Sequence, residues 1–254
     1  MQALPSPPPK PVAEVWRPEL VRLPLLTPWR RGFRRFIRGL MRALSFVCLR
    51  VDVRGLENFP RQGPAIIVIN HLGDADAAVL VGLLPAELEA LGKIELYDFP
   101  ILGKLMEMYG IIWLHRGRAD RRAMRAALDG LAEGRVLVIA PEGRYSLIHG
   151  LEGGGNGAAF LARMADVPLV PVAMTSTENA HVYGNLRRLR RAPVSLTVGV
   201  PFRLADPDAS TSFATEGPLK DVRITRGDTR RIMESLAALL PSEYRGVYSD
   251  RPEI

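Results

Sequence analysis

The stretch Ile66-Ile67-Val68-Ile69-Asn70-His71-Leu72-Gly73-Asp74-Ala75-Asp76 indicates both the fold class of this chain and the place of its chemistry. Its first four residues are apolar and β-branched, which is typical of a buried strand. The run stops at Asn70 and His71, and a helical apolar stretch follows Asp76. A histidine at a strand end, with a carboxylate five residues on at a helix start, can act as an oriented general base. His71 and Asp76 are therefore the catalytic candidates.

A second polar turn follows another strand-like run. Pro141-Glu142-Gly143-Arg144 comes directly after the apolar residues 136–140. The two strand ends can bring these polar residues to one edge of one sheet.

The chain repeats the His-x4-Asp spacing at His115 and Asp120. There the sequence favours a strand-end histidine followed by an aspartate that caps the next helix, in a solvated stretch rich in arginine. A turn in which Asp74 or Asp76 caps the helix is the matching alternative for His71. The position of His71 in a tight loop directly off a buried strand favours a functional role.

Four ordered blocks of this chain resemble those of the PlsC-type glycerolipid acyltransferases, which include the 1-acylglycerol-3-phosphate acyltransferases. The resemblance covers about residues 50–205, and its blocks are Asn70-His71-x4-Asp76, Gly110-Ile111-Ile112-Trp113-Leu114-His115-Arg116, Pro141-Glu142-Gly143-Arg144 and Val167-Pro168-Leu169-Val170-Pro171-Val172-Ala173.

The resemblance implies an O-acyltransferase of phospholipid biosynthesis. His71, oriented by Asp76, would take the proton of an acceptor hydroxyl, which attacks the carbonyl of an acyl thioester. The acceptor would be a lysophospholipid, 1-acylglycerol-3-phosphate above all, and the donor acyl-CoA or acyl carrier protein, with no further cofactor. Substrate binding would fall to residues in or near the matching blocks: Asn70, Lys93, Arg116, Glu142, Gly143 and Arg144, with the arginine forks suited to phosphate.

Three positions depart from the family pattern. Gly73 stands where the family usually has serine, and Arg144 is shifted by one position from the usual arginine. A glycine-rich run, residues 153–157, replaces a segment that often carries a basic residue. These changes bear on the choice of acceptor rather than on the base.

Composition fits one α/β enzyme domain. The chain has 254 residues, 47% of them hydrophobic, which is enough for a full core. Its single cysteine, Cys48, excludes an internal disulfide and lies among apolar neighbours. No zinc-like Cys/His spacing and no nucleotide phosphate loop occur in the sequence, so we expect no metal.

The excess positive charge is N-terminal. Residues 1–50 hold ten basic and two acidic residues, whereas the net charge of the whole chain is +7. Within them, Trp29, Phe33, Phe36, Ile37 and Leu40 form an apolar stripe at helical spacing, with six arginines in between. Such a helix is too charged to span a bilayer and suits an anionic membrane surface.

We therefore expect a peripheral protein at the cytoplasmic face of a membrane, with no signal peptide. The alternative is a helix that packs its stripe on the protein's own core. Nucleic-acid binding is disfavoured, because the rest of the chain lacks a basic face and a reading motif.

The whole chain reads as a single layered α/β domain, with a mostly parallel or mixed central sheet flanked by helices and an N-terminal amphipathic helix. We expect a disordered or extended lead-in over residues 1–28, the basic helix over 29–50 and the acyltransferase domain over 51–254. Expected strands are Val47–Val53, Ala65–Asn70, Ile111–Leu114, Arg135–Ala140, Leu169–Ala173 and Val194–Val200. Expected helices are Arg30–Leu44, Asp76–Leu84, Pro100–Tyr109, Ala119–Glu133, Asn156–Ala165 and Asp228–Leu240, with a loop over Ala205–Gly217.

Two other functions remain open. The same base could activate water, which would make the protein an acyl-thioester hydrolase, although the Gly-x-Ser-x-Gly elbow of serine hydrolases is missing from the sequence. The fold and the basic helix could also serve a membrane-binding protein without enzymatic activity.

Overall fold

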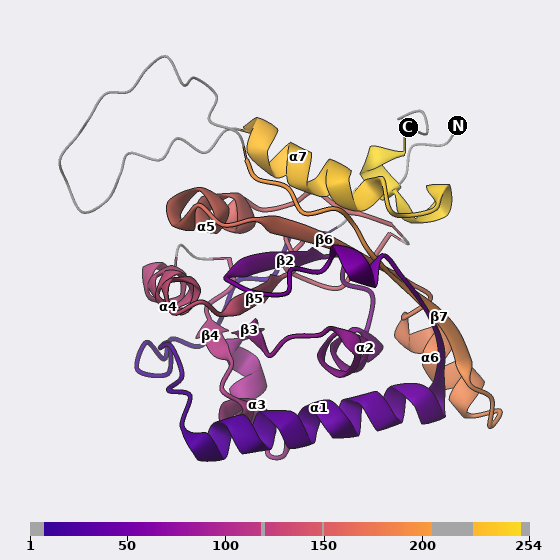
Figure 1. The fold of residues 1–254 in the computed structure, drawn as a ribbon, viewed down its shortest axis with the longest axis horizontal. Coiled ribbons are helices and arrows are strands. Elements are labelled where there is room, and N and C mark those ends of the chain that lie inside the picture. Colours follow the sequence, from indigo (N-terminus) through magenta and orange to yellow (C-terminus); the bar gives the residue numbers. More distant parts are fainter. Residues whose placement is uncertain (1–7, 118–119, 149, 205–225, 250–254) are drawn as a thin grey trace.

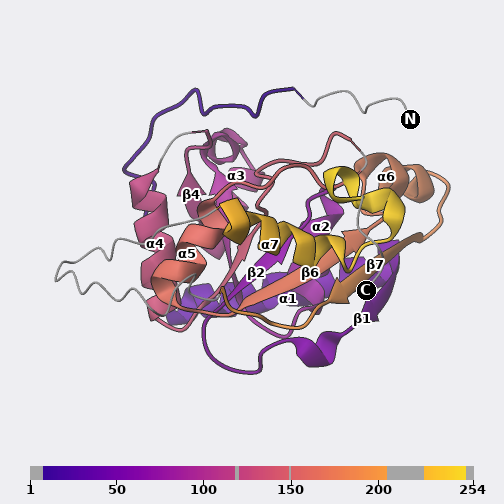
Figure 2. The same cartoon turned by 90° about the horizontal axis from the view of Figure 1, so that it is seen from above.

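The structure is a computed structural model that describes residues 8–117, 120–148, 150–204 and 226–249. The described residues form one mixed seven-stranded sheet with helices on both faces (Figures 1 and 2), which confirms the expected fold class. The strands are β1 (Leu49–Arg54), β2 (Ala65–Ile69), β3 (Leu88–Lys93), β4 (Ile112–Leu114), β5 (Val136–Ile139), β6 (Leu169–Thr175) and β7 (Ala192–Val198). The helices are α1 (Pro28–Cys48), α2 (Ala75–Leu83), α3 (Leu102–Tyr109), α4 (Arg121–Ala132), α5 (Gly157–Ala165), α6 (Asn179–Leu186) and α7 (Arg226–Ala237), with 3-10 turns η1 (Leu56–Asn58), η2 (Ile94–Asp98), η3 (Ser242–Tyr244) and η4 (Gly246–Tyr248).

The sheet runs in the order β1-β7-β6-β2-β5-β3-β4. All neighbouring strands are parallel except β6 and β7, which pair antiparallel. The registers place Val68 of β2 beside Ile139 of β5, and Lys93 of β3 beside Leu114 of β4. The carboxyl ends of β2, β3, β4 and β5 therefore meet at one edge, where ligands bind in open α/β sheets.

Strand β2 is the centre of the core, because all five of its residues are buried. Since successive side chains of a strand point to opposite faces, its residues divide between two apolar clusters. Ile66 and Val68 pack with residues of α4, α5 and α7. Ile67 and Ile69 pack with residues of α2 and α6 on the other face. Because both faces of β2 are buried, the run of residues 66–69 is apolar without interruption.

Several expected elements need correction. Strand β3 and helix α6 were not expected. Val47 and Cys48 belong to the end of α1 instead of a strand, so β1 begins only at Leu49. Other expected elements agree to within a few residues of their ends, and the expected loop Ala205–Gly217 lies outside the described residues, as does Ala119.

Helix α1 begins at a clear start signal and lies against α2 and α3 (Figure 1). Thr27 precedes Pro28, and the Thr27 hydroxyl accepts a hydrogen bond from the Arg30 amide at 3.2 Å. A threonine cap followed by proline in the first turn is a favourable helix start.

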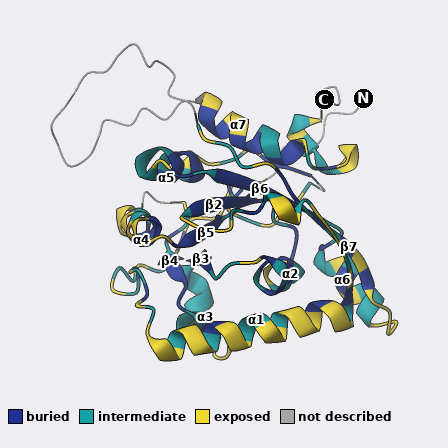
Figure 3. Ribbon diagram, viewed as in Figure 1, coloured by how far each residue is buried: buried dark blue, intermediate teal, exposed yellow. Residues whose placement is uncertain are grey.

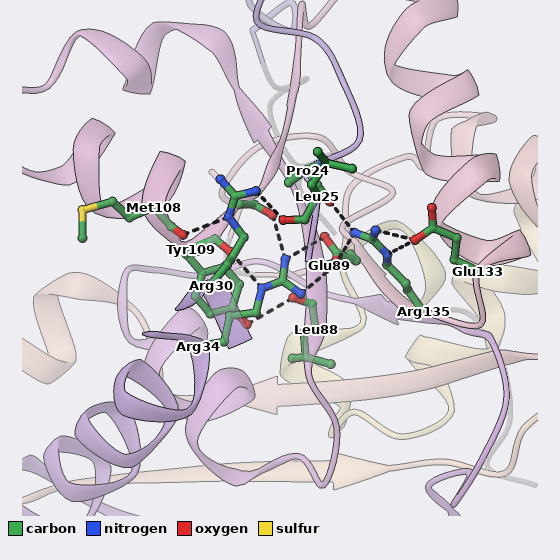
Figure 4. A network of polar contacts seen from close by, with 11 residues as sticks. Pro24, Leu25, Arg30, Arg34, Leu88, Glu89, Met108, Tyr109, Glu133 and Arg135 are labelled. Atoms are coloured by element: carbon green, nitrogen blue, oxygen red, sulfur yellow. Dashed lines mark hydrogen bonds and ion pairs between the residues drawn. The ribbon is translucent and has the colours of Figure 1, made fainter. Parts of the chain in front are cut away.

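A buried ion network fastens α1 to the sheet (Figure 4). The Arg34 guanidinium donates to both carboxylate oxygens of Glu89 in β3, at 2.6 and 3.0 Å, and Arg135 reaches the same carboxylate at 3.1 Å. Arg34 also donates to the carbonyl oxygens of Tyr109 and Gly110. Arg34 and Glu89 are both almost completely buried. The positive charge of Arg34 is therefore neutralised by a buried ion pair and is not available on the outer surface of α1.

Three of the five residues of the apolar stripe of α1, Trp29, Phe36 and Leu40, are exposed, and the other two, Phe33 and Ile37, are half-buried. Trp29, Phe36 and Val47 are 60%, 64% and 71% exposed, and Figure 3 shows the outer side of α1 as a largely exposed surface. The alternative that the whole stripe packs on the protein's own core therefore does not hold for Trp29, Phe36 and Leu40, whereas Phe33 and Ile37 are partly covered. Two of the arginines between the apolar residues turn inward: Arg34 is buried, and the half-buried Arg38 donates to the Leu84 carbonyl at 2.8 Å.

Candidate active site

The loop between β2 and α2 presents His71 on a buried carboxylate. Asp76 Oδ2 lies 2.7 Å from His71 Nδ1, and it accepts the backbone amides of Leu72 at 2.8 Å and Gly73 at 3.1 Å. Asp76 is completely buried, whereas the His71 side chain is 30% exposed. A carboxylate fixed in this way orients the imidazole through Nδ1 and leaves Nε2 for a hydroxyl.

Asn70 fastens this loop to the neighbouring strand. Its side-chain amide donates to the Met174 carbonyl of β6, and its side-chain oxygen accepts the Met174 amide, both at 2.8 Å. Asn70 is 2% exposed. The carboxamide is thus a support for the His71 loop, and its predicted contact with substrate stays a prediction.

Glu142 and Gly143 follow β5 beside the histidine loop. The Ser146 amide, four residues beyond Glu142, donates to the His71 carbonyl at 2.8 Å, which ties the two loops together. Glu142 is completely buried and accepts the Glu152 amide at 2.8 Å. Burial raises the pKa of the Glu142 carboxyl to about 7.

Arg116 joins the second and third sequence blocks. Its Nη1 donates to the Gly143 carbonyl at 2.7 Å, and Gly143 has a left-handed backbone with φ of 71°. Lys93 ends β3, next to Leu114 of β4. Among the described residues the Lys93 ammonium has no hydrogen bond or ion pair, so its place at this edge is set by the strand register alone.

Arg144 is already paired inside the protein. Its guanidinium donates to Glu152 Oε2 at 2.7 and 2.9 Å, and Glu152 is 2% exposed. The Pro8 carbonyl accepts a third hydrogen bond from Arg144 at 2.8 Å. A phosphate bound at Arg144 would have to share or replace these partners, so phosphate binding by Arg144 stays a prediction.

The second histidine–aspartate pair has a similar geometry in a different setting. His115 Nδ1 lies 2.6 Å from Asp120 Oδ2, but His115 is completely buried. Its Nε2 accepts the Arg17 amide at 2.9 Å, and its ring packs against Trp16 with centroids 4.3 Å apart. Asp120 Oδ1 accepts the Ala123 amide at 3.1 Å, which confirms Asp120 as the cap of α4. Both ring nitrogens of His115 are engaged, so of the two histidines His71 is the one open to a substrate.

The N-terminal segment crosses this edge of the sheet, which the sequence did not predict. Lys10 Nζ donates to the Gly153 carbonyl at 2.8 Å, and the Ala13 amide donates to the Arg116 carbonyl at 2.8 Å. Burial lowers the pKa of the Lys10 ammonium, and the charges of Glu152 and Glu142 oppose that shift. Ala13 is buried, so the extended lead-in is packed on the domain from at least this residue.

No group of three or more histidine, cysteine, aspartate or glutamate side chains suited to a metal ion is found within the described ranges. In the same residues, no helix combines the length and the apolar character required to cross a membrane.

A solvent-accessible imidazole on a buried carboxylate, at the carboxyl edge of a mixed sheet, is typical of enzymes that activate a hydroxyl nucleophile. Residues 50–175 match the model of the family described as Acyltransferase, and this chain belongs to that family.

Named relatives support the same assignment. The chloroplastic 1-acyl-sn-glycerol-3-phosphate acyltransferase LPAT1 of Arabidopsis thaliana is 28% identical over 182 residues, which are 67% of this chain and 51% of that protein. The 1-acyl-sn-glycerol-3-phosphate acyltransferase alpha of Ovis aries is 29% identical over 170 residues, 65% of this chain and 59% of that protein. This chain spans about half the length of the plant relatives that it matches.

A solved structure shares the fold. The crystal structure of the 1-acyl-sn-glycerophosphate (LPA) acyltransferase PlsC from Thermotoga maritima matches with a TM-score of 0.55 and 24% identity. The match covers 70% of this chain and 73% of that one.

Proposed function

We propose that this protein is an O-acyltransferase that moves an acyl chain from a thioester to the free hydroxyl of 1-acylglycerol-3-phosphate, which gives phosphatidic acid. The observation that carries the proposal is the pair of His71 and Asp76, in which Asp76 holds one ring nitrogen of a side chain that is 30% exposed. The names of the relatives, 1-acyl-sn-glycerol-3-phosphate acyltransferases, supply the substrate class.

The reaction follows from the site's chemistry. His71 Nε2 takes the proton of the acceptor hydroxyl as its oxygen forms a bond to the thioester carbonyl carbon. Asp76 stabilises the imidazolium that results. The carbon–sulfur bond then breaks, which leaves the acyl chain on the acceptor and releases the thiolate. The thiolate takes the proton back from His71, so the products are the ester and the free thiol, and the neutral base is restored. Because a thiol has a pKa of about 8.5, the leaving group needs little acid assistance, and one base suffices.

The acceptor's phosphate would be bound beside this base. Arg116 is the strongest candidate, because its guanidinium reaches the Gly143 carbonyl and so lies between the second and third loops. Arg144 and Lys93 border the same edge, and Glu142 with the Gly143 backbone would position the glycerol portion. The thiol donor would be coenzyme A or acyl carrier protein.

A panel assay tests this function. Purified protein is incubated with acyl-CoA or acyl carrier protein thioesters and with lysophospholipids that carry different head groups, and the products are identified by mass spectrometry. We expect phosphatidic acid to form fastest, from 1-acylglycerol-3-phosphate. Free fatty acid without a diacyl product would instead assign a hydrolase, and no turnover of any thioester would favour a binding protein without enzymatic activity.

We also propose peripheral attachment to the anionic cytoplasmic face of a membrane through α1. The support is the outward apolar face of α1, with exposed Arg31, Arg35 and Arg42 on the same helix. Sedimentation with anionic and neutral vesicles tests it, with Phe36→Ser compared with Leu189→Ser at an exposed leucine outside α1. The first substitution should weaken binding to anionic vesicles and the second should not. Equal binding by both variants and the parent would refute attachment through α1.

A further inference from the structure

Asp74 organises a polar cluster next to the catalytic histidine. It occupies the cap position of α2, but its side chain makes no capping hydrogen bond, which corrects the expectation that Asp74 caps the helix. Its carboxylate instead accepts the Tyr145 hydroxyl at 2.7 Å, the Tyr183 hydroxyl at 2.9 Å and the Asn179 amide group at 3.0 Å. The cluster thus joins three separate segments: the histidine loop, the loop after β5, and α6.

Gly73 makes this cluster possible. A Cβ atom at position 73 would lie 2.4 Å from the Thr177 carbonyl oxygen and 2.6 Å from Asn179 Oδ1. Asn179 Oδ1 approaches this closely because it accepts the Asp74 amide at 2.8 Å. Any residue with a side chain would displace Asn179 from Asp74. The absence of a side chain at Gly73 therefore leaves the space that Asn179, at the start of α6, occupies.

Tyr145 links this cluster to the catalytic base, because it contacts both Asp74 and His71. Its ring meets the His71 imidazole edge-on, with centroids 4.3 Å apart and planes at 65°. The hydrogen bond to Asp76 fixes Nδ1 of the ring, and the Tyr145 contact limits how the ring tilts about that bond. Asp74, through the Tyr145 hydroxyl, keeps the tyrosine ring in this place.

Tyr145 does not itself take part in proton transfer. Burial raises the pKa of its hydroxyl, and the hydrogen bond to Asp74 raises that pKa further. The phenol therefore stays protonated and donates to Asp74, so it is unable to act as a base for an acceptor hydroxyl.

We propose that Tyr145 is a positioning residue, which keeps His71 Nε2 aimed at the acceptor hydroxyl. The inference rests on the proposed function. Tyr145 gives the His71 ring a second contact, in addition to the hydrogen bond with Asp76. Its consequence is a loss of turnover, rather than of acceptor affinity, when the ring contact is removed.

Two substitutions of Tyr145 and a matched control test this role. Tyr145→Leu removes the aromatic edge, Tyr145→Phe keeps the edge and loses the hydroxyl, and Phe99→Leu makes the same aromatic-to-leucine change at an exposed position outside the site. Turnover with a soluble short-chain acceptor should fall roughly tenfold to hundredfold in Tyr145→Leu, with the acceptor KM unchanged. Tyr145→Phe should retain more turnover than Tyr145→Leu, and Phe99→Leu should match the parent.

Nitrogen NMR of the His71 imidazole gives a readout that does not depend on activity. In Tyr145→Leu the ring should show exchange broadening, while the Phe99→Leu spectrum stays like that of the parent. A parent-like spectrum together with parent-like turnover in Tyr145→Leu would overturn the proposal, as would a raised acceptor KM at unchanged turnover. If the parent only hydrolyses thioesters, the proposed transfer fails. The role of Tyr145 is then still decided by hydrolysis rates, which should be lowest in Tyr145→Leu and parent-like in Phe99→Leu, together with the His71 spectra.

Discussion

Replacing Glu142 by glutamine should stabilise the protein at alkaline pH. The Glu142 carboxyl is completely buried, and its Oε1 has no hydrogen-bond partner among the described residues. Burial is the main cause that raises its pKa to about 7 from an ordinary 4.5, while the backbone amides of Glu152 and His71 oppose the shift. The folded protein therefore binds the Glu142 proton more tightly than the unfolded chain does.

The size and sign of the effect follow from proton linkage. A shift from 4.5 to about 7 corresponds to about 3–4 kcal/mol, at about 1.4 kcal/mol for each pKa unit. Below pH 4.5 the carboxyl is protonated in both states and this cost is absent. Between pH 4.5 and 7 the folded state binds more protons, so stability falls as pH rises. Above pH 7 the ionised carboxylate is buried at the full cost.

Urea unfolding of the parent and of Glu142→Gln at pH 5 and pH 8 measures this difference. The variant's advantage should grow by up to about 3 kcal/mol between the two pH values. Glu57→Gln, at an exposed glutamate, is the control and should show little change at either pH. An advantage that is the same at pH 5 and pH 8, or a variant less stable than the parent at pH 8, would refute the reasoning. If Glu142 serves the substrate, the stabilised variant should also lose activity.

Three further substitutions test other parts of the structure. Glu89→Gln leaves the buried Arg34 guanidinium without a counter-charge, removes one of the two carboxylates that pair with Arg135, and should destabilise the protein by about 3–5 kcal/mol in urea unfolding, whereas Glu133→Gln, at a largely exposed partner, should cost less than about 1 kcal/mol. His115→Ala should cost on the order of 2–4 kcal/mol of stability yet keep most of the turnover of the folded enzyme; a loss of turnover without a loss of stability would contradict its structural role. Arg116→Ala should raise the KM for a phosphate-bearing acceptor more than it lowers kcat, and Arg116→Lys should rescue it only in part; an unchanged KM would remove Arg116 from the phosphate site.

The sequence predicted the elements whose local signals agree with their tertiary place. The β2 run and the turn after it combine β-branched residues with an abrupt polar end, and the structure has the strand and the His71 loop there. Strand β3, Leu88-Glu89-Ala90-Leu91-Gly92-Lys93, was missed because it has no β-branched residue and contains two charged residues and a glycine. Its buried Glu89 is stabilised by Arg34 on a distant helix, and no local pattern reveals such a pair.

The candidate site shows the same limit. The spacing of His71 and Asp76 indicated a hydrogen-bonded pair, and it indicated the His115 pair equally well. In the structure, burial and the Arg17 amide on His115 Nε2 separate the two, and both depend on how the segment around Trp16 packs. The pairing of Arg144 with Glu152 was likewise invisible, because the two residues meet through the shape of the loop between them.

The most direct test of the central claim is the product formed by the parent protein and by His71→Ala. Both are incubated with an acyl thioester and 1-acylglycerol-3-phosphate, after circular dichroism has shown that the two are equally folded, and phosphatidic acid is measured by mass spectrometry. We predict that the parent forms phosphatidic acid and that His71→Ala forms it about 10²–10⁴-fold more slowly, the usual worth of a general base. Phosphatidic acid formed by His71→Ala at the parental rate would contradict the assignment of His71 as the base.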